Sequence, residues 1–271
     1  MSPTVVTLSC VNLKGGVGKT ALAVNFAAYC GTSGRPTLLI DLDPQTNATF
    51  SCIDVDEWER HAARHGTVAD LLGARDHASA EGKQRSVESI IRRNVFENVD
   101  LIPSHLDLFT IDLDLASATA REFKLRRAIK PIENDYEIIV CDCPPNLTIP
   151  TQNALAASTH YVVPVSPDYL SGLGIGLLLT RVNKFCGDLE HELENAGIVI
   201  SRVGRRALHR EMTVAAIRER FKDLVLTHTI SERVKVSESA AANRPIFDMG
   251  DSKASEEFTE ISEEILERIG V

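Results

Sequence analysis

One stretch of the chain decides its fold: Lys14-Gly15-Gly16-Val17-Gly18-Lys19-Thr20. The apolar run over residues 5–11 before it predicts a buried strand, and residues 21–29 after it predict a helix. A glycine-rich turn between a strand and a helix points backbone N–H groups inward, and the helix N-terminus adds partial positive charge. The stretch therefore predicts a nucleoside-triphosphate site, with Lys19 reaching the β- and γ-phosphates and the Thr20 hydroxyl holding Mg²⁺. The predicted phosphate-binding residues are Lys14, Gly15, Gly16, Val17, Gly18, Lys19, Thr20 and Ala21.

The loop departs from the standard phosphate-loop pattern at its start. Leu13 stands where that pattern has a glycine, and Lys14 adds a second cation beside Lys19. Because Lys19 already serves the loop's own phosphates, we expect Lys14 to act in trans across a dimer, as an arginine finger does. The alternative is that Lys14 is only a solvated charge.

Carboxylates end two further apolar runs. Asp41 and Asp43 close one run, on the same face of the strand because side chains alternate. Asp142 closes the other and is followed by two prolines, in the manner of a Walker-B strand whose carboxylate contacts the metal. A carboxylate such as Asp41 or Asp43 near a γ-phosphate can orient an attacking water or hold Mg²⁺, and the candidate metal ligands are Thr20, Asp41 and Asp142. A turn that merely ends the first strand is the alternative for Asp41 and Asp43.

Strand and helix patterns alternate along the chain, which predicts a doubly wound, mostly parallel α/β sheet flanked by helices. We expect a single domain over residues 1–271, since no linker or repeat interrupts it. The segment 54–89 is polar and gives no clear pattern. The predicted strands cover residues 5–12, 37–43, 99–102, 138–143, 160–165, 198–202 and 225–230, and the predicted helices cover 19–29, 121–130, 170–185, 211–221 and 256–269.

Composition indicates an ordinary globular protein, with 44% hydrophobic and 25% charged residues among 271. No secretory leader or membrane-spanning run is evident, so we expect a cytoplasmic protein. The six cysteines are irregularly spaced, which favours reduced thiols over a disulfide framework. Cys141 and Cys143 invite a metal interpretation, but no second pair completes four ligands, and buried thiols are the simpler explanation.

A net charge of −9 argues against wholesale coating of nucleic acid, although a local basic face would suffice. The densest stretch of basic residues, between positions 202 and 222, is the candidate for non-specific contacts with DNA phosphates. An ordinary solvated helix is the alternative. A second cluster of basic residues, a weaker candidate for DNA contact, lies between residues 121 and 130. The DNA-contact candidates are Arg202, Arg205, Arg206, Arg210 and Arg218, with Arg220 and Lys222 close behind.

With these motifs in order, the chain resembles the ParA/MinD family of deviant Walker-A ATPases, and most closely the short ParA-type (Soj-like) partition ATPases. The resemblance extends through nearly the whole chain. Besides the loop, it is carried by Asp41-Leu42-Asp43-Pro44-Gln45-x-Asn47-Ala48-Thr49, Leu101-Ile102-Pro103, Asp142-Cys143-Pro144-Pro145, Asn153-Ala154-Leu155-Ala156-Ala157, Val236-x-Glu238-Ser239 and Arg244-Pro245-Ile246.

The resemblance implies an ATP- and Mg²⁺-dependent switch. ATP would drive two subunits to sandwich two nucleotides, with Lys14 crossing to the partner's phosphates and Asp43 positioning the hydrolytic water. The ATP-bound homodimer would bind DNA without sequence preference on the nucleoid. A centromere-bound, ParB-like protein would then stimulate slow hydrolysis and so drive plasmid or chromosome partition.

Two departures from the family pattern affect these expectations. Ala21 replaces a second hydroxyl residue, so one α-phosphate contact is missing. Ser231, Glu232 and Arg233 stand where partition ATPases commonly have Pro-Arg-Asn, which puts both adenine contact and DNA contact there in doubt.

Three other functions stay open at this point. A positioning ATPase for a protein cargo, such as a carboxysome or chemoreceptor cluster, would share this chemistry and differ in its partner. A MinD-like, membrane-cycling cell-division regulator needs a basic amphipathic C-terminal helix, whereas residues 255–267 are acidic and predict a helix packed on the core, without membrane binding. A metallocluster reductase of the nitrogenase iron-protein type needs two cysteines at a dimer interface.

Overall fold

Eight strands form one sheet in the part of the chain that the structure, a computed structural model, describes: residues 5–73, 85–168, 171–204 and 208–271. Their order is β3-β4-β2-β5-β1-β6-β7-β8, and all neighbouring pairs are parallel except β3 and β4. The strands are β1 (Val6–Cys10), β2 (Thr37–Asp41), β3 (Arg92–Phe96), β4 (Val99–Ile102), β5 (Ile138–Asp142), β6 (His160–Val165), β7 (Glu194–Val203) and β8 (Val225–Ser231). The predicted α/β class is confirmed.

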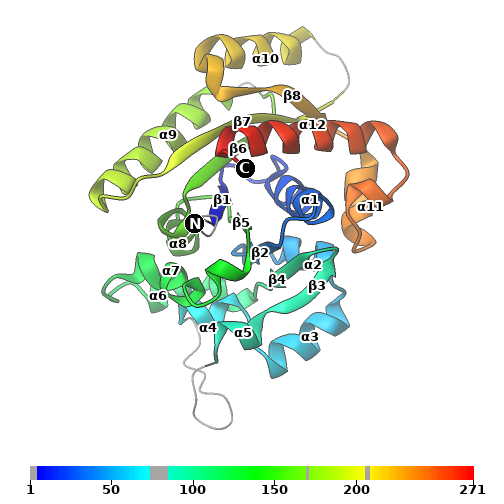
Figure 1. Cartoon of the computed structure of the whole chain (residues 1–271). Helices are drawn as coiled ribbons and strands as arrows, with labels where there is room; N and C mark the ends of the chain where they lie inside the picture. The colour runs from blue at the N-terminus through cyan, green and yellow to red at the C-terminus, as the bar shows by residue number, and fades with distance from the viewer. Residues whose placement is uncertain (1–4, 74–84, 169–170, 205–207) are drawn as a thin grey trace.

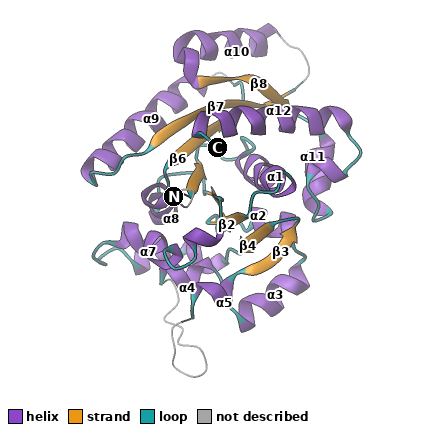
Figure 2. Ribbon diagram, viewed as in Figure 1, coloured by secondary structure: helices purple, strands orange, loops and turns teal. Residues whose placement is uncertain are grey.

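Helices cover both faces of the sheet (Figure 1 and Figure 2). On one face lie α1 (Lys19–Thr32) and α12 (Ser252–Ile269), and on the other α8 (Ile149–Ala157), α9 (Ser171–Asp188) and α10 (Leu208–Phe221). The remaining α-helices are α2 (Asn47–Cys52), α3 (Val55–Arg64), α4 (Val68–Leu72), α5 (Val87–Ile90), α6 (Ile111–Asp114), α7 (Lys124–Ile129) and α11 (Val234–Ala241). Short 3₁₀ helices span Leu106–Phe109, Arg121–Phe123, Glu133–Asp135, Lys222–Leu224 and Ile246–Asp248.

The central strands feed two hydrophobic cores, one on each face of the sheet. In β5, Ile138 and Val140 belong to the core beneath α1 and α12, whereas Ile139 and Cys141 belong to the opposite core. All four are fully buried, each at 0% exposure. Fully burying one large aliphatic side chain stabilises the fold by about 1.5–3 kcal/mol. Burial on both faces explains why these strands are continuous apolar runs rather than alternating ones.

In the middle of the sheet, the connections that follow neighbouring strands lead to opposite sides of the sheet. β1 pairs with β5 on one side and β6 on the other. The chain leaves β1 through α1 towards β2, whereas it leaves β5 through α8 towards β6. Connections that diverge in this way open a crevice at the carboxyl ends of the strands, where ligands of such sheets bind.

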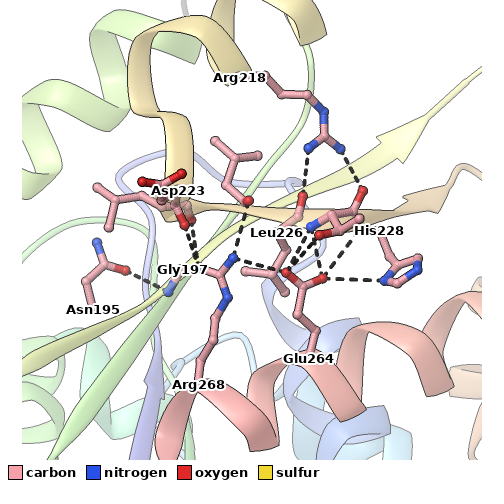
Figure 3. A network of polar contacts seen from close by, with 11 residues as sticks. Asn195, Gly197, Arg218, Asp223, Leu226, His228, Glu264 and Arg268 are labelled. Atoms are coloured by element: carbon pink, nitrogen blue, oxygen red, sulfur yellow. Dashed lines mark hydrogen bonds and ion pairs between the residues drawn. The ribbon is translucent and has the colours of Figure 1, made fainter.

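The edge strand β8 is covered by side chains from two helices (Figure 3). Glu264 of α12 accepts hydrogen bonds of 2.9 Å from the Thr227 backbone N–H, and Arg218 of α10 donates to the carbonyl oxygens of Leu226 and Thr227, each at 2.9 Å. Arg268 donates to the Asp223 carbonyl at 2.9 Å. These contacts satisfy backbone groups that an unpaired edge would leave open to another strand.

Every predicted strand is present, with ends that differ by a few residues. The predicted helix 121–130 is instead a 3₁₀ turn followed by α7, and residue 170, where another helix was expected to begin, lies outside the described residues. β3 and the helices α2 to α6, α8 and α11 were not predicted. In β3 the polar residues Arg92, Arg93 and Asn94 hide the strand, and Pro150 hides α8, although proline is compatible with the first turn of a helix.

Candidate nucleotide-binding site

The loop predicted to bind phosphates joins the end of β1 to the start of α1. Gly16 and Gly18 have φ angles of 73° and 85°, in the left-handed region that favours glycine. Gly18 is also the residue that caps α1, so the free N–H groups of the first helical turn belong to this loop. Lys19 is only 6% exposed, and its Nζ donates to the Lys14 carbonyl at 3.3 Å. The loop thus curls around one buried ammonium group.

Asp142, at the end of β5, offers free oxygens beside this loop. It is fully buried, and neither carboxylate oxygen has a hydrogen-bond partner among the described residues. Burial raises the pKa of Asp142 well above its usual range, and the nearby Asp41 raises it further. The Thr20 hydroxyl lies close enough to lower this pKa, although its placement does not meet hydrogen-bond geometry.

The environment of Asp142 fits a divalent cation held together with phosphates. In nucleotide sites Mg²⁺ uses one or two protein oxygens and completes its shell with water and phosphate. The Asp142 carboxylate and the Thr20 hydroxyl can supply those oxygens. Among the described residues, no group of three or more His, Cys, Asp or Glu side chains could hold a metal without such help.

Asp41 has a different environment from Asp142, its register partner on β5. Its oxygens accept three hydrogen bonds, from the Asp43 N–H at 3.1 Å, the Thr49 N–H at 2.8 Å and the Thr49 hydroxyl at 2.7 Å. Burial raises its pKa from 3.8 to about 7. Asp41 therefore fastens the turn after β2 to α2, and Asp142 is the better candidate of the two for a metal ligand.

Asp43 lines a cavity that adjoins the phosphate loop, and it is 6% exposed. Its Oδ1 accepts a hydrogen bond of 2.9 Å from the Gln45 N–H, and its carbonyl accepts one of 2.7 Å from the Ser104 hydroxyl. The first contact orients the carboxylate and the second holds the backbone of Asp43. Asp43 can therefore face a triphosphate bound in this cavity.

The Lys14 ammonium is paired with a carboxylate from outside its own loop. Its Nζ lies 2.5 Å from Oδ2 of Asp168, which follows β6. Burial raises the pKa of Asp168, but the hydrogen bonds from Lys14 and Ser166 outweigh it and leave the pKa below its usual value. The two lysines of the loop therefore have different environments, because Lys19 is buried and the Lys14 side chain is 60% exposed.

A cavity of about 880 Å³ adjoins the phosphate loop. Its walls come from the loop, from α1 and α2 on one side, and from residues 230–241 around α11 on the other. Ala21 lines it, as do Ser231, Glu232 and Arg233, the three residues that depart from the family pattern. A nucleotide with its phosphates on the loop can extend into this cavity, which residues of both α2 and α11 line.

The described candidate DNA contacts have different environments, although Arg202 and Arg210 line the same cavity. Arg202 donates to the Gly16 carbonyl and pairs with Glu232 at 2.8 Å, and Arg218 is bound to the edge of β8. Arg210 lines a second cavity, of about 560 Å³, next to Lys14. Arg205 and Arg206 lie outside the described residues. Arg202 and Arg218 thus serve contacts within the chain.

Sequence reasoning missed three residues of the site. Ser201, Arg202 and Asp168 all contact the phosphate loop or Lys14, and they come from the ends of β6 and β7. Nothing in the spacing of residues along the chain indicates that β7 ends near a loop about 185 residues earlier, because that neighbourhood depends on strand order. Arg202 was noticed only for its charge.

The structure also describes the paired cysteines and the C-terminal helix, which bear on the alternative interpretations of the sequence. Cys141 and Cys143 are fully buried free thiols, and burial raises the pKa of both. The C-terminal helix α12 packs on the core through Phe258, Ile261 and Ile265, as predicted for a helix in this segment. None of the helices that the structure describes is both long and apolar enough to cross a bilayer.

A family model and a curated relative each match most of this chain. The family model described as an AAA domain (AAA_31) matches residues 5–195. The chromosome-partitioning ATPase Soj of Treponema pallidum is 33% identical over 240 residues, which cover 89% of this chain and 88% of Soj.

Two solved structures are similar over almost their whole length. A plasmid partition protein of Borrelia burgdorferi bound to AMPPNP has a TM-score of 0.77 and 26% identity, and the match covers 97% of this chain and 98% of that one. A cobyrinic acid a,c-diamide synthase of Mycobacterium smegmatis, with a bound ATP analogue and magnesium, has a TM-score of 0.77 and 25% identity over 96% and 93% of the two chains.

Proposed function

This chain belongs to the AAA_31 family, among the ParA/Soj-type partition ATPases, and from that membership we propose that it is a nucleotide-dependent dimerising switch that drives DNA partition. ATP and Mg²⁺ are its cofactors, as the ligands of similar structures indicate. In the ATP state the homodimer binds DNA without sequence preference. A ParB-like, centromere-binding protein stimulates hydrolysis, which is slow without it. We place the protein in the cytoplasm, on the nucleoid while ATP is bound.

The observation that carries this proposal is the separation of the two lysines in one loop. Lys19 is enclosed by the loop, whereas the Lys14 ammonium is directed to Asp168 at its rim. A cation held outside its own phosphate site has the placement that a trans-acting group needs. This supports a reaction that is completed only when a second subunit supplies its Lys14.

The chain's own residues divide the work of ATP hydrolysis. Lys19 and the N–H groups of residues 15–21 bind the phosphates, and Lys14 of the facing subunit stabilises charge that develops during transfer. Asp43 orients the attacking water. Asp142 and Thr20 hold Mg²⁺, which neutralises phosphate charge when bound, and Asp41 positions the turn that carries Asp43.

The DNA surface is proposed on α10 and the segment before it, the region of Arg202, Arg205, Arg206, Arg210 and Arg218. Arg202 and Arg218 have partners within the chain, so they contribute less to phosphate contact than their charge suggests. Arg220 and Lys222, which follow on the same stretch, are exposed. Non-specific binding needs only cations at suitable positions, which this stretch supplies.

The test is binding to random-sequence duplex DNA with ATP, with ADP and without nucleotide. Asp43→Ala holds the ATP state during the measurement, and Lys19→Ala is the control that cannot bind nucleotide. We expect binding only with ATP, weakening steeply as salt rises. Equal binding in all three states contradicts the nucleotide switch. Absence of binding in every state removes the DNA step and favours a switch that acts on a protein cargo.

A further inference from the structure

Strand β7 contacts the phosphate loop through two consecutive residues, Ser201 and Arg202, which also line the cavity beside it. The Ser201 hydroxyl donates to the Val17 carbonyl, and Nη1 of Arg202 donates to the Gly16 carbonyl, both at 2.5 Å. Two neighbouring side chains thus hold two neighbouring peptide groups of the loop. The peptide that joins Gly16 to Val17 is the one in contact with the guanidinium.

The backbone of Arg202 is unusual at this point. Its φ is 53°, in the left-handed region, which for a residue with a side chain costs on the order of 1–3 kcal/mol. The other end of its guanidinium is held by Glu232, whose Oε1 lies 2.8 Å from Nη2. Glu232 follows β8 and lines both cavities beside the loop. Arg202 therefore joins the ends of β7 and β8 to the phosphate loop.

This contact changes the chemistry of the peptide that it touches. The carbonyl of Gly16 and the N–H of Val17 belong to the same peptide group. A charged donor on the carbonyl withdraws electron density and makes the N–H of that peptide a stronger donor. In a phosphate loop the N–H groups face the ligand while the carbonyls face away. The guanidinium, which also lines the cavity beside the loop, can thus act on the phosphates through the backbone.

We propose that Arg202 is a positioning residue for the nucleotide's phosphates, acting through the Gly16–Val17 peptide, and that Glu232 orients it. The proposal rests on the nucleotide-binding function above and deepens it. It gives a role to Glu232, which replaces a basic residue of the family pattern. It also accounts for the contact that Arg202, the first residue of the basic stretch, makes with the loop.

The experiment is titration of the full chain with a fluorescent MgADP analogue, which binds without turnover. We expect Arg202→Ala to weaken binding about tenfold, and Arg202→Lys to be intermediate because an ammonium group lacks the planar fork that reaches both acceptors. Glu232→Ala alone should weaken binding about threefold, but it should cause no further loss when Arg202 is already alanine. Arg181→Ala, which removes an exposed positive charge from α9, is the matched control.

A second readout follows the peptide itself. In protein labelled with ¹⁵N-valine, the Val17 amide proton should move downfield when MgADP binds, and this movement should shrink in Arg202→Ala. A merely structural arginine would lower the melting temperature without changing that shift selectively. Binding within twofold of wild type with an unchanged Val17 shift overturns the proposal, and so do additive losses in the double variant. If wild type and Lys19→Ala both fail to bind MgADP, the proposed function itself is wrong.

Discussion

The Lys14 ammonium lies 2.5 Å from the carboxylate of Asp168, a residue 154 positions further along the chain. The contact holds the second lysine of the phosphate loop at its rim, where Lys14 is 60% exposed and Asp168 is 36% exposed. An ion pair this open contributes little to stability, about 0–1 kcal/mol. Its consequence is therefore positional, because it leaves the Lys14 side chain exposed, as the proposed action across a dimer requires.

Lys14→Gln tests whether this cation acts in catalysis or is only solvated. We expect hydrolysis at saturating ATP to fall about 100-fold or more, since a trans-acting cation contributes mainly to the transition state. Affinity for MgADP should change less than about threefold, because Lys19 and the loop N–H groups remain. Phosphate release and nucleotide titration measure the two quantities. Lys184→Gln, at an exposed position of α9, is the control. A comparable loss of MgADP affinity would instead make Lys14 a ligand of its own loop.

Asp43→Ala should separate nucleotide binding from turnover. The carboxylate lies at the cavity wall, fixed by the Gln45 N–H, where it can orient a water molecule. Removing such a group lowers the rate by about 10² to 10⁴ without removing phosphate contacts. We expect ATP-dependent dimers that persist, seen by light scattering after size exclusion, with little phosphate released. Wild-type turnover in this variant would exclude Asp43 from the reaction.

Asp142→Asn should stabilise the nucleotide-free protein while it weakens Mg²⁺-dependent binding. Burial raises the pKa of Asp41 from 3.8 to about 7, and Asp142 is raised as well. Between pH 4 and 7 the folded chain holds protons that the unfolded chain has released, so the free energy of unfolding falls as pH rises through this window. Removing one carboxylate should flatten that slope. Urea denaturation at pH 5.5 and 8 measures it, and an unchanged slope would show that the pair does not control it.

Glu264→Ala should loosen the edge of the sheet without touching the nucleotide site. It removes the acceptor for the N–H groups of Thr227 and His228, at a cost of about 1–3 kcal/mol. Burial raises the pKa of Glu264, but those hydrogen bonds outweigh it and lower the pKa from 4.5. Its contribution is therefore complete above pH 4.5 and is lost as pH falls below it. Urea denaturation at pH 7 should show the loss, whereas the exposed Glu256→Ala should stay within about 0.5 kcal/mol of wild type.

The fold was predictable wherever a strand is buried on both faces. The apolar runs that became β1, β2 and β5 needed no tertiary information, because both of their faces require hydrophobic residues. β3 was not predicted because it is an exposed, antiparallel edge strand with a residue at positive φ, Asn94. The segment 54–89 looked irregular from its polar composition, yet α3 begins there with an Asp54 cap that accepts from the Glu57 N–H.

The candidate site was only partly predictable for a related reason. Asp41 and Asp142 looked equivalent in the sequence, since each ends an apolar run. Only the structure distinguishes them, by giving three hydrogen bonds to Asp41 and none to the buried oxygens of Asp142 among the described residues. Hydrogen-bond partners come from whichever residues the fold brings close, and Thr49 reaches Asp41 through the turn between β2 and α2.

The sequence by itself determined the phosphate loop, the carboxylates at the strand ends and the family, because those features depend on residues that are neighbours along the chain. The tertiary structure decided which charges are free to act. It placed Asp168 beside Lys14, bound Arg218 to the edge of β8, and turned Arg202 towards Gly16. The physical reason is that a charged group's role depends on its counter-ion and its burial. In a parallel sheet both are set by strand order, which brings together residues that lie far apart in the sequence.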